Sequence, residues 1–378
     1  METYKLSDLC EILDSKRKPL SALQRAKKQG IYPYYGAQGI IDHLDDYLLD
    51  GEYLLVAEDG ANLETRNQPI ANIAKGKIWV NNHAHVLGNN GKCPLNLLGF
   101  ILNNMNISPY VTGCAQPKLN QENLRNIEIE LPSHIDSIAS ILSSLDRKIE
   151  LNNKINADLE EMAQAIFKNW FVDFEPFKDG KFVDSELGMI PEGWKVGTLE
   201  DIAEITMGQS PAGNSLNENG EGMIFYQGSS DFGFRFPSIR VFTTEPKRLA
   251  VANSVLFSVR APVGDINVAK EECCIGRGVA SIKSKYGHDS YLFYTMKSLH
   301  KLFDSFDGEG TVFGSINKKT LSTIQILLPS DGIVEQFNNI ASSFDNRIRS
   351  LSDESSRLSL LRDTLLPRLM SGELEVPE

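Results

Sequence analysis

Two similar seven-residue phrases, SSLDRKI and SSFDNRI, stand 199 positions apart in this chain, beginning at Ser143 and Ser342. The likeness continues without a gap, so that 143–171 aligns on 342–370. Each stretch alternates spacings of four and three between mostly apolar residues, which is the pattern of a helix lying along a partner helix. The first copy has Leu145, Ile149, Asn152, Asn156, Leu159, Ala163, Ile166 and Trp170, and the second has Phe344, Ile348, Leu351, Ser355, Leu358, Leu365 and Leu369, with Arg362 as a misfit. The pattern predicts two long helices of one duplicated design.

The duplication extends beyond the helices. LRNIEIELPS (124–133) and LSTIQILLPS (321–330) each alternate apolar and polar residues before a proline, which predicts a short half-buried strand and then a helix start. Upstream, YKLSDLCEI (4–12) resembles WKVGTLEDI (194–202), and GEYLLVAEDGANL and NSVLFSVRAPVGDI both look like apolar strands that end in glycine-containing loops. A period of roughly 190–200 residues indicates a duplicated domain rather than a solenoid.

The segment between the halves, FEPFKDGKFVDSELGMIPEGW, is interrupted by glycines and prolines and predicts a linker. We therefore expect an α+β fold, with two duplicated mixed α/β domains separated by a pair of long antiparallel coiled-coil helices around an approximate two-fold axis. The expected boundaries are 1–131 for the first domain, 132–177 for the central helix, 178–193 for the linker, 194–330 for the second domain and 331–378 for the C-terminal helix.

The predicted helices constrain what such a chain could do. A helix over 133–171 would be about 58 Å long and would expose its apolar seam unless its own copy covered it. The polar seam residues Asn152, Asn156 and Ser355 either fix the register or are imperfections. Two-fold proteins on duplex DNA read half-sites about 34 Å apart, and the two diverged halves predict half-sites of different sequence.

Composition narrows the class of protein. The length of 378 residues suits two domains, no run approaches about 18 apolar residues, and the N-terminus has no leader pattern, so we expect a cytoplasmic protein. Five cysteines form no CxxC pair, and we expect free thiols. The formal charge of −12 means that binding to DNA would require local basic faces.

Several motifs in order resemble the specificity subunits of type I restriction-modification systems over essentially the whole chain: IFKNWFVDFEPF, ELGMIPEGWKVGTLEDI, the paired strand-proline-helix hinges and LRDTLLPRLMSGELEVP. The resemblance implies two target recognition domains, with helices that space them and dock adenine-methylating modification subunits carrying S-adenosylmethionine. Restriction subunits would supply ATP- and Mg-dependent translocation and cleavage. The chain itself would bind no cofactor and be no enzyme, and it contains neither GxxxxGK[ST] nor an Asn-Pro-Pro-aromatic tetrapeptide.

Candidate DNA contacts come from basic stretches, such as SKRKPLSALQRAKKQG, and from polar residues beside glycines. Basic residues would neutralise phosphates or form a solvated face, and Gln38 would pair with adenine or belong to a packed loop. The arginines would contact guanine or a carboxylate inside the domain, and Asn120 and Asn317 are expected to cap helical turns. The predicted contacts are Arg17, Lys18, Lys27, Lys28, Tyr35, Gln38, Gln116, Lys118, Gln227, Ser229, Arg235, Arg260, Arg277, Lys318 and Lys319.

Other features carry weaker hypotheses. The residues predicted to dock a modification subunit are Phe167, Trp170, Phe171, Leu365 and Leu369. For Trp170 and Phe171, core packing is the alternative. His83 and His85 have no neighbouring carboxylate or third ligand in sequence, so we expect polar surface residues and no metal site. The rival functions are a protein scaffold that does not bind DNA and a duplicated enzyme that uses the loop 308–314 for a nucleotide.

Overall fold

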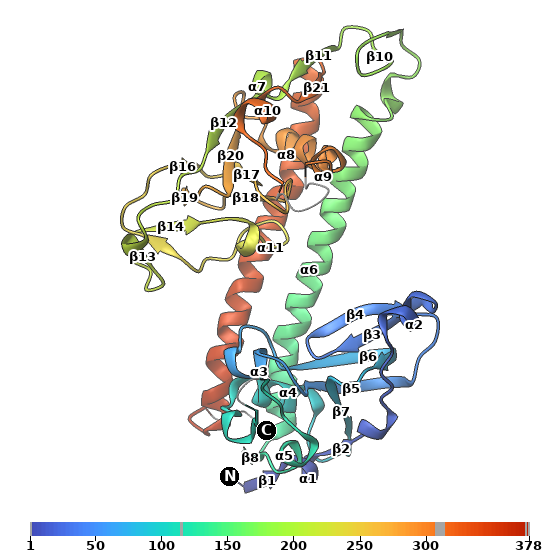
Figure 1. Cartoon of the computed structure of the whole chain (residues 1–378), viewed down its shortest axis with the longest axis vertical. Coiled ribbons are helices and arrows are strands. Elements are labelled where there is room, and N and C mark those ends of the chain that lie inside the picture. The colour runs from blue at the N-terminus through green and yellow to red at the C-terminus, as the bar shows by residue number, and fades with distance from the viewer. Residues whose placement is uncertain (1, 114–115, 307–313, 375, 377–378) are drawn as a thin grey trace. The chain divides into compact units, whose positions relative to one another are not determined.

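The computed structural model describes residues 2–113, 116–306, 314–374 and 376, and Figure 1 labels its helices and strands. The chain divides into unit 1, Met1–Asn152 with Asp353–Glu378, and unit 2, Asn153–Ser352. Helices α6 (Ile135–Phe171) and α11 (Asp331–Met370) each contribute one part to each unit. Both predicted long helices are therefore present, although α11 ends at Met370 and not at the expected 378.

Unit 1 is built on a six-stranded sheet. Its order is β2 (Cys10–Ile12), β7 (Ala84–Asn89), β5 (Leu49–Ala57), β6 (Ala71–Val80), β3 (Gln29–Gly36) and β4 (Gly39–Leu44). All neighbours are antiparallel except β3 and β6, which are parallel. The shorter elements are α1 (Leu6–Leu9), η1 (Asp14–Lys16), α2 (Ala22–Ala26), α3 (Asn62–Thr65), α4 (Leu95–Asn104), η2 (Ser108–Tyr110) and α5 (Gln121–Arg125).

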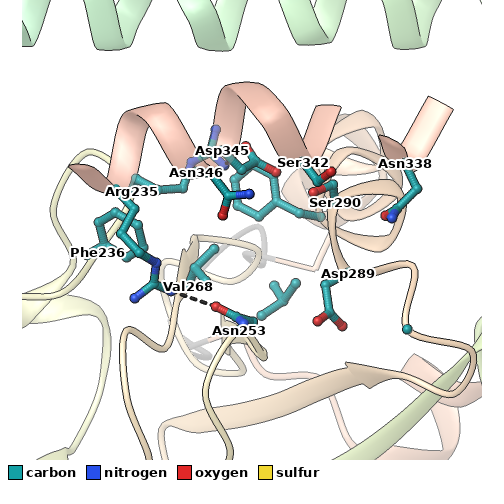
Figure 2. A pocket seen from close by; sticks show the side chains of 14 residues that line it. Arg235, Phe236, Asn253, Val268, Asp289, Ser290, Asn338, Ser342, Asp345 and Asn346 are labelled. Carbon is teal, nitrogen blue, oxygen red and sulfur yellow. Dashed lines mark hydrogen bonds and ion pairs between the residues drawn. The ribbon is translucent and has the colours of Figure 1, made fainter. Parts of the chain in front are cut away.

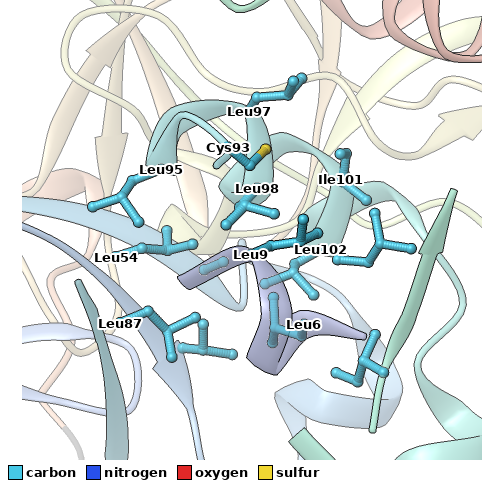
Figure 3. Packing of buried hydrophobic residues seen from close by; sticks show 14 of the residues in the cluster. Leu6, Leu9, Leu54, Leu87, Cys93, Leu95, Leu97, Leu98, Ile101 and Leu102 are labelled. Carbon is cyan, nitrogen blue, oxygen red and sulfur yellow. The ribbon is translucent and has the colours of Figure 1, made fainter. Parts of the chain in front are cut away.

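The core of unit 1 lies between this sheet and its helices. Figure 3 shows Leu6 and Leu9 of α1 facing Leu98 and Leu102 of α4, with Leu54 of β5 beside them. Burial of side chains of this size contributes about 1.5–3 kcal/mol each. The strand predicted from LRNIEIELPS is β8 (Glu128–Leu131), which pairs antiparallel with β1 (Glu2–Lys5) and buries alternate residues.

Unit 2 repeats part of this plan. A four-stranded antiparallel sheet runs β12 (Ala203–Met207), β20 (Val279–Ser284), β17 (Val255–Ser258) and β18 (Ile266–Val268), the same order as β2, β7, β5 and β6 in unit 1. A second sheet holds β13 (Leu216–Asn217), β15 (Phe242–Thr243), β14 (Met223–Tyr226), β19 (Cys273–Ile275) and β16 (Leu249–Ala250).

The entry to unit 2 also matches unit 1. Strand β11 (Lys195–Thr198) leads into α7 (Leu199–Ile202) and pairs antiparallel with β21 (Gln325–Leu328), the strand predicted from LSTIQILLPS. Helices α8 (Asp289–Ser298), α9 (His300–Asp304) and α10 (Lys318–Ser322) and the turns η4 (Gly213–Ser215) and η5 (Ser229–Asp231) complete the unit. The internal duplication read from the sequence is therefore present in the strand order and in the paired entry strands.

The segment expected to be an irregular linker is folded instead. It forms η3 (Glu175–Phe177) and a short hairpin of β9 (Phe182–Val183) with β10 (Ile190–Pro191). Its aromatic residues explain the difference, because the Trp194 ring lies 5.5 Å from that of Phe174 and 5.2 Å from that of Phe177. The segment therefore packs onto the core of unit 2.

Within each unit, parts of α6 and α11 contact each other through polar groups. In unit 1, Asn152 donates to Glu354 at 2.9 Å, and Arg362 contacts Asp146 at 2.6 Å. In unit 2, Asn156 donates to Ser352 at 3.4 Å. The paired numbers rise along α6 as they fall along α11 in unit 1, so the two segments run antiparallel there.

The aspartate of the repeated phrase has the same role in both units. Asp146 accepts from Arg362 at 2.6 Å in unit 1, and Asp345 accepts from Arg235 at 2.5 Å in unit 2. Arg362, a misfit in the apolar pattern, also lies 5.8 Å from the Phe100 ring of α4. Each copy of the phrase thus supplies a carboxylate that holds an arginine beside the helix.

The structure buries three of the five predicted docking residues. Phe167 and Phe171 are 6% exposed and lie in the core of unit 2, and Leu369 is 5% exposed in the core of unit 1. Trp170 and Leu365 are half-buried against the same cores. These side chains pack into the cores of the units, and for Phe171 this is the core alternative given above.

Candidate nucleic-acid interface

In unit 1, the loops that carry the predicted contacts are tied together around one buried histidine. His85 of β7 is fully buried, with Nδ1 2.6 Å from Asp14 Oδ2 and Nε2 2.7 Å from the carbonyl oxygen of Leu119. A carboxylate and a carbonyl only accept, so this geometry is satisfied when both ring nitrogens donate. Gln121 also donates to Asp14. The strand β7, the turn η1 and the loop before α5 are therefore joined at one point.

Arg17 was predicted as a phosphate contact, and in the structure it belongs to this network inside unit 1. Its guanidinium contacts Glu58 at 2.5 Å, Asp14 at 3.3 Å and the carbonyl oxygen of Ala84 at 2.9 Å. Its side chain is 14% exposed, because the guanidinium neutralises two carboxylates that the fold buries. Arg17 thus joins the loops that carry Asp14, Glu58 and Ala84.

These partners lower the pKa values of the two carboxylates in the network. Burial raises the pKa of Asp14, but the hydrogen bonds and charges of His85, Val86 and Arg17 outweigh it, and the net pKa lies below its ordinary value. Burial likewise raises the pKa of Glu58, and Arg17 and Lys118 lower it by more. Asp14, Glu58 and His85 lie close enough for a metal ion, yet Arg17 and Lys118 already neutralise the carboxylates. The cluster therefore fits an internal salt network better than a metal site.

The remaining basic candidates of unit 1 differ in whether an acidic side chain pairs with them. Lys18 and Lys27 are exposed and make no ion pair among the described residues. Lys28 lies 3.5 Å from Asp45 and 5.9 Å from the Trp79 ring, and Lys118 contacts Glu58 at 3.1 Å with half of its side chain exposed. Lys18 and Lys27 are thus the better phosphate candidates.

The polar candidates of unit 1 lie at exposed turns. Gln38 occupies the tip of the β3–β4 hairpin, whereas Tyr35 at the end of β3 is half-buried against a small apolar cluster. Gln116 is exposed just before Lys118. Asn120 caps α5 by accepting from Asn123 N–H, and Asn317 caps α10 by accepting from Thr320 N–H, so the predicted capping is confirmed.

In unit 2, three predicted residues meet at one set of loops. Gln227 accepts from the Ser210 hydroxyl at 3.1 Å, and the same hydroxyl accepts from the Arg277 amide at 3.3 Å. The Gly278 amide donates to the Gln227 carbonyl, and the Gly278 carbonyl accepts from Val259, the residue before Arg260. Gln227, Arg260 and Arg277 are all exposed. Backbone hydrogen bonds therefore hold the loops, while two guanidiniums and an amide face outward.

Small residues allow this close approach. A Cβ on Gly276 would lie 2.7 Å from Gln227 Oε1, and one on Gly278 would lie 2.6 Å from the Gln227 carbonyl oxygen. Ser210 is the member of the cluster that sequence reasoning missed. No motif marks it, because only the fold brings the loop after β12 against Gln227.

Arg235 was predicted to contact DNA and does not. It is 3% exposed and contacts Glu160 of α6 at 3.0 Å and Asp345 of α11 at 2.5 Å, with the Tyr294 hydroxyl 3.0 Å away. Its guanidinium also lies 4.1 Å from the centre of the Phe293 ring. The carboxylate alternative is the correct one, and Arg235 fixes a loop of the domain to both helices within unit 2.

A pocket of about 170 Å³ adjoins this ion pair. Figure 2 shows Asp345 and Asn346 of α11 on one side and Asn253 and Asp289 on the other. Its charged groups have partners within the protein, since Arg349 donates to Asn253 at 2.6 Å and Asp289 contacts Lys283 at 2.6 Å. The pocket therefore lies where the loops of unit 2 pack against α11.

The last predicted contacts lie at two turns of unit 2. Ser229 begins the turn η5 and is half-buried, and Lys318 and Lys319 are exposed in the first turn of α10. The bridge between Arg260 and Ser315 brings the segment before α10 next to the cluster of Gln227 and Arg277. Among the described residues, no helix has the length and apolar character needed to cross a membrane.

Comparison with known proteins agrees with this architecture. Residues 1–161 and 191–358 match the family described as type I restriction modification DNA specificity domain. The "Putative type I restriction enzyme MjaX specificity subunit" of Methanocaldococcus jannaschii is 35% identical over 281 residues, which cover 72% of this chain and 65% of that protein. The match thus spans just under two thirds of that relative's length.

A further relative and a solved structure extend the comparison. The type I restriction enzyme HindI specificity subunit of Haemophilus influenzae is 25% identical over 335 residues, covering 68% of this chain and 71% of that protein. A crystal structure of the type I restriction-modification system S subunit from M. genitalium has the same fold, with a TM-score of 0.57 at 16% identity over 100% of this chain and 96% of that chain. The chain therefore belongs to the family of type I restriction modification DNA specificity domains.

Proposed function

We propose that this chain is the DNA sequence-specificity subunit of a type I restriction-modification complex and that it reads a bipartite, asymmetric duplex target. The observation that carries the proposal is the exposed cluster of Gln227, Arg260 and Arg277 on the loops of unit 2. Arginine forks onto guanine O6 and N7, and glutamine pairs with adenine N6 and N7 in the major groove. Glycine-supported loops held by backbone hydrogen bonds present these groups in a fixed arrangement.

The two units would read the two halves of the target. They share the order of four strands but differ in the residues that follow those strands, which supports two half-sites of different sequence. Lys18 and Lys27 in unit 1 and Lys318 and Lys319 in unit 2 would contact phosphates, which position a protein without reading bases.

The long helices would act as spacer and docking surface. The antiparallel contacts within unit 1 support pairing of α6 with α11 as a coiled coil. Modification and restriction subunits would bind this chain and carry S-adenosylmethionine, ATP and Mg²⁺. The chain would hold no cofactor of its own, catalyse no reaction and act in the cytoplasm.

Sequencing of methylated adenines across the host genome, with and without this gene, tests the proposal. We expect one bipartite, asymmetric adenine motif to disappear when the gene is deleted. An unchanged methylome in cells that express the modification subunit would contradict the proposal. It would favour the scaffold alternative, in which the units bind proteins and no duplex DNA.

A further inference from the structure

An exposed histidine–aspartate pair stands among the loops of unit 1. His83 Nδ1 lies 3.0 Å from Oδ1 and 2.8 Å from Oδ2 of Asp59. Half of the His83 side chain is exposed, whereas Asp59 is 17% exposed. Because a carboxylate only accepts, the ring donates through Nδ1, and in the neutral ring the other nitrogen, Nε2, is then an acceptor.

The main chain holds this pair in place. The His83 amide donates to the buried Asn81 side chain at 2.7 Å, and the His83 carbonyl accepts from the Glu58 amide at 2.9 Å. Asp59 forms a bridge with Lys118 in the neighbouring segment. An ordinary surface histidine samples several rotamers, but here the Asp59 carboxylate favours one ring direction and the two main-chain contacts hold the backbone that carries the ring.

Strand pairing identifies the equivalent place in unit 2. Leu87 lies between Ile12 and Leu54 in unit 1, and Ile282 lies between Ile205 and Val255 in unit 2. Counting five residues from Leu54 and from Val255 leads to Asp59 and Arg260, respectively. The bridges confirm the match, because Asp59 pairs with Lys118 and Arg260 pairs with Ser315, each two residues before a capping asparagine.

The two units therefore carry groups of opposite charge and opposite hydrogen-bonding capacity at equivalent positions. Arg260 offers only hydrogen-bond donors, whereas Asp59 with His83 offers a negative charge and an acceptor. Guanine presents two acceptors in the major groove, whereas cytosine and adenine present amino groups that donate. The difference matches the asymmetric target proposed above.

We propose that His83, oriented by Asp59, reads one base pair of the half-site of unit 1 by accepting a hydrogen bond at Nε2 from an exocyclic amino group of cytosine or adenine. The inference rests on the proposed function and extends it to a residue and a base edge. Asp59 is a positioning residue, because its carboxylate holds the ring and keeps the proton on Nδ1.

Genome-wide methylation in hosts that carry single variants tests the proposal. His83→Ala should relax the motif at one position of one half-site, from cytosine or adenine to any base, and leave the other half-site unchanged. His83→Gln keeps an acceptor and should retain much of the preference. His43→Ala is the matched control, because His43 is an exposed histidine of the same unit whose ring has no carboxylate contact in the described structure.

A binding measurement with the assembled methyltransferase complex distinguishes a base contact by His83 from a structural effect of the substitution. On a duplex that carries the observed motif, removal of the amino group at that one base should weaken wild-type binding about tenfold. The same removal should leave His83→Ala binding unchanged. If the wild-type motif persists in His83→Ala, or if a folded variant loses methylation altogether, the proposed role of His83 is wrong. Either outcome leaves the proposed function of the chain in place. A wild-type protein without any bipartite motif would overturn both the proposed function and the role of His83.

Discussion

At the scale of single residues, an arginine of this chain is buried or exposed according to whether carboxylates inside the fold pair with it. Arg235 and Arg260 both stand near glycines or loops in the sequence, yet one is buried between two helices and the other is exposed. The difference depends on Glu160 and Asp345, which lie far away in sequence on α6 and α11. Buried charges remain stable only when such partners neutralise them.

Replacement of Arg235 by methionine should lower the free energy of unfolding by about 3 kcal/mol or more, because Glu160 and Asp345 lose their shared partner. Denaturant unfolding followed by circular dichroism measures this loss. Arg248→Met, at an exposed arginine of the same unit, is the control and should change stability by less than about 0.5 kcal/mol. Equal small effects in both variants would show that the buried ion pair is not stabilising.

The network around His85 makes the stability of unit 1 sensitive to acid. The pKa values of Asp14 and Glu58 are lowered in the folded chain, so their contribution is present above the unfolded values near pH 4 and is lost as pH falls through the folded values. Asp14→Asn should therefore reduce stability at pH 7 and flatten its dependence on pH between about 5 and 2. Thermal unfolding across this range, with the exposed Asp46→Asn as control, would refute the assignment if both variants keep the wild-type slope.

At the scale of elements, the long helices combine apolar burial with buried polar groups. Asn152 and Asn156 are 0% and 3% exposed, and the Oδ1 atom of each has no hydrogen-bond partner among the described residues. Such a group costs about 1–3 kcal/mol when it is left unsatisfied. These positions therefore lower stability, and register selection is the property that would offset this cost.

Asn156→Leu should raise the free energy of unfolding by about 1–2 kcal/mol, since an unsatisfied amide oxygen is replaced by an apolar group. Denaturant unfolding measures the gain, and Asn153→Leu on the exposed side of α6 is the control. A loss of stability at Asn156 would mean that its 3.4 Å contact with Ser352 is worth more than the burial of a leucine.

At the scale of the whole molecule, the formal charge of −12 coexists with local basic positions, so binding to DNA should depend on a few lysines. The double substitution Lys18→Ala with Lys27→Ala should weaken binding to all duplexes alike and reduce the salt slope by about two, because two phosphate contacts release fewer counterions. Titration of labelled duplexes at several salt concentrations measures the slope. The exposed pair Lys75 and Glu52, replaced together by alanine, is a charge-neutral control, and an unchanged slope in the lysine variant would exclude these contacts.

The two units should also act independently. Arg260→Ala should relax guanine preference in one half-site, and adding His83→Ala should relax the other without changing the first. The effects should add, because the two positions belong to different units. Methylome motifs of the two single variants and the double variant provide the measurement, and relaxation of both half-sites by Arg260→Ala alone would show that it positions the complex.

The sequence by itself determined the features that depend on local pattern. The helix spacings predicted α6 and α11, alternation predicted β8 and β21, and the two asparagine caps followed from their position before a helical turn. The internal duplication also followed, because similar phrases occur in both halves, whereas the order of the strands is known only from the structure. Helices, short strands and caps depend on residues a few positions apart, so the sequence is enough to predict them.

Only the tertiary structure decided which polar residues face outward. Arg17 and Arg235 are paired internally, Phe167 and Phe171 are buried, and the predicted linker packs on unit 2. His83 and His85 stand two residues apart, yet one is exposed beside Asp59 and the other is enclosed with Asp14. The burial of the Arg235 charge depends on Asp345, a partner 110 residues away. No local pattern records that pairing, and the fold alone brings it about.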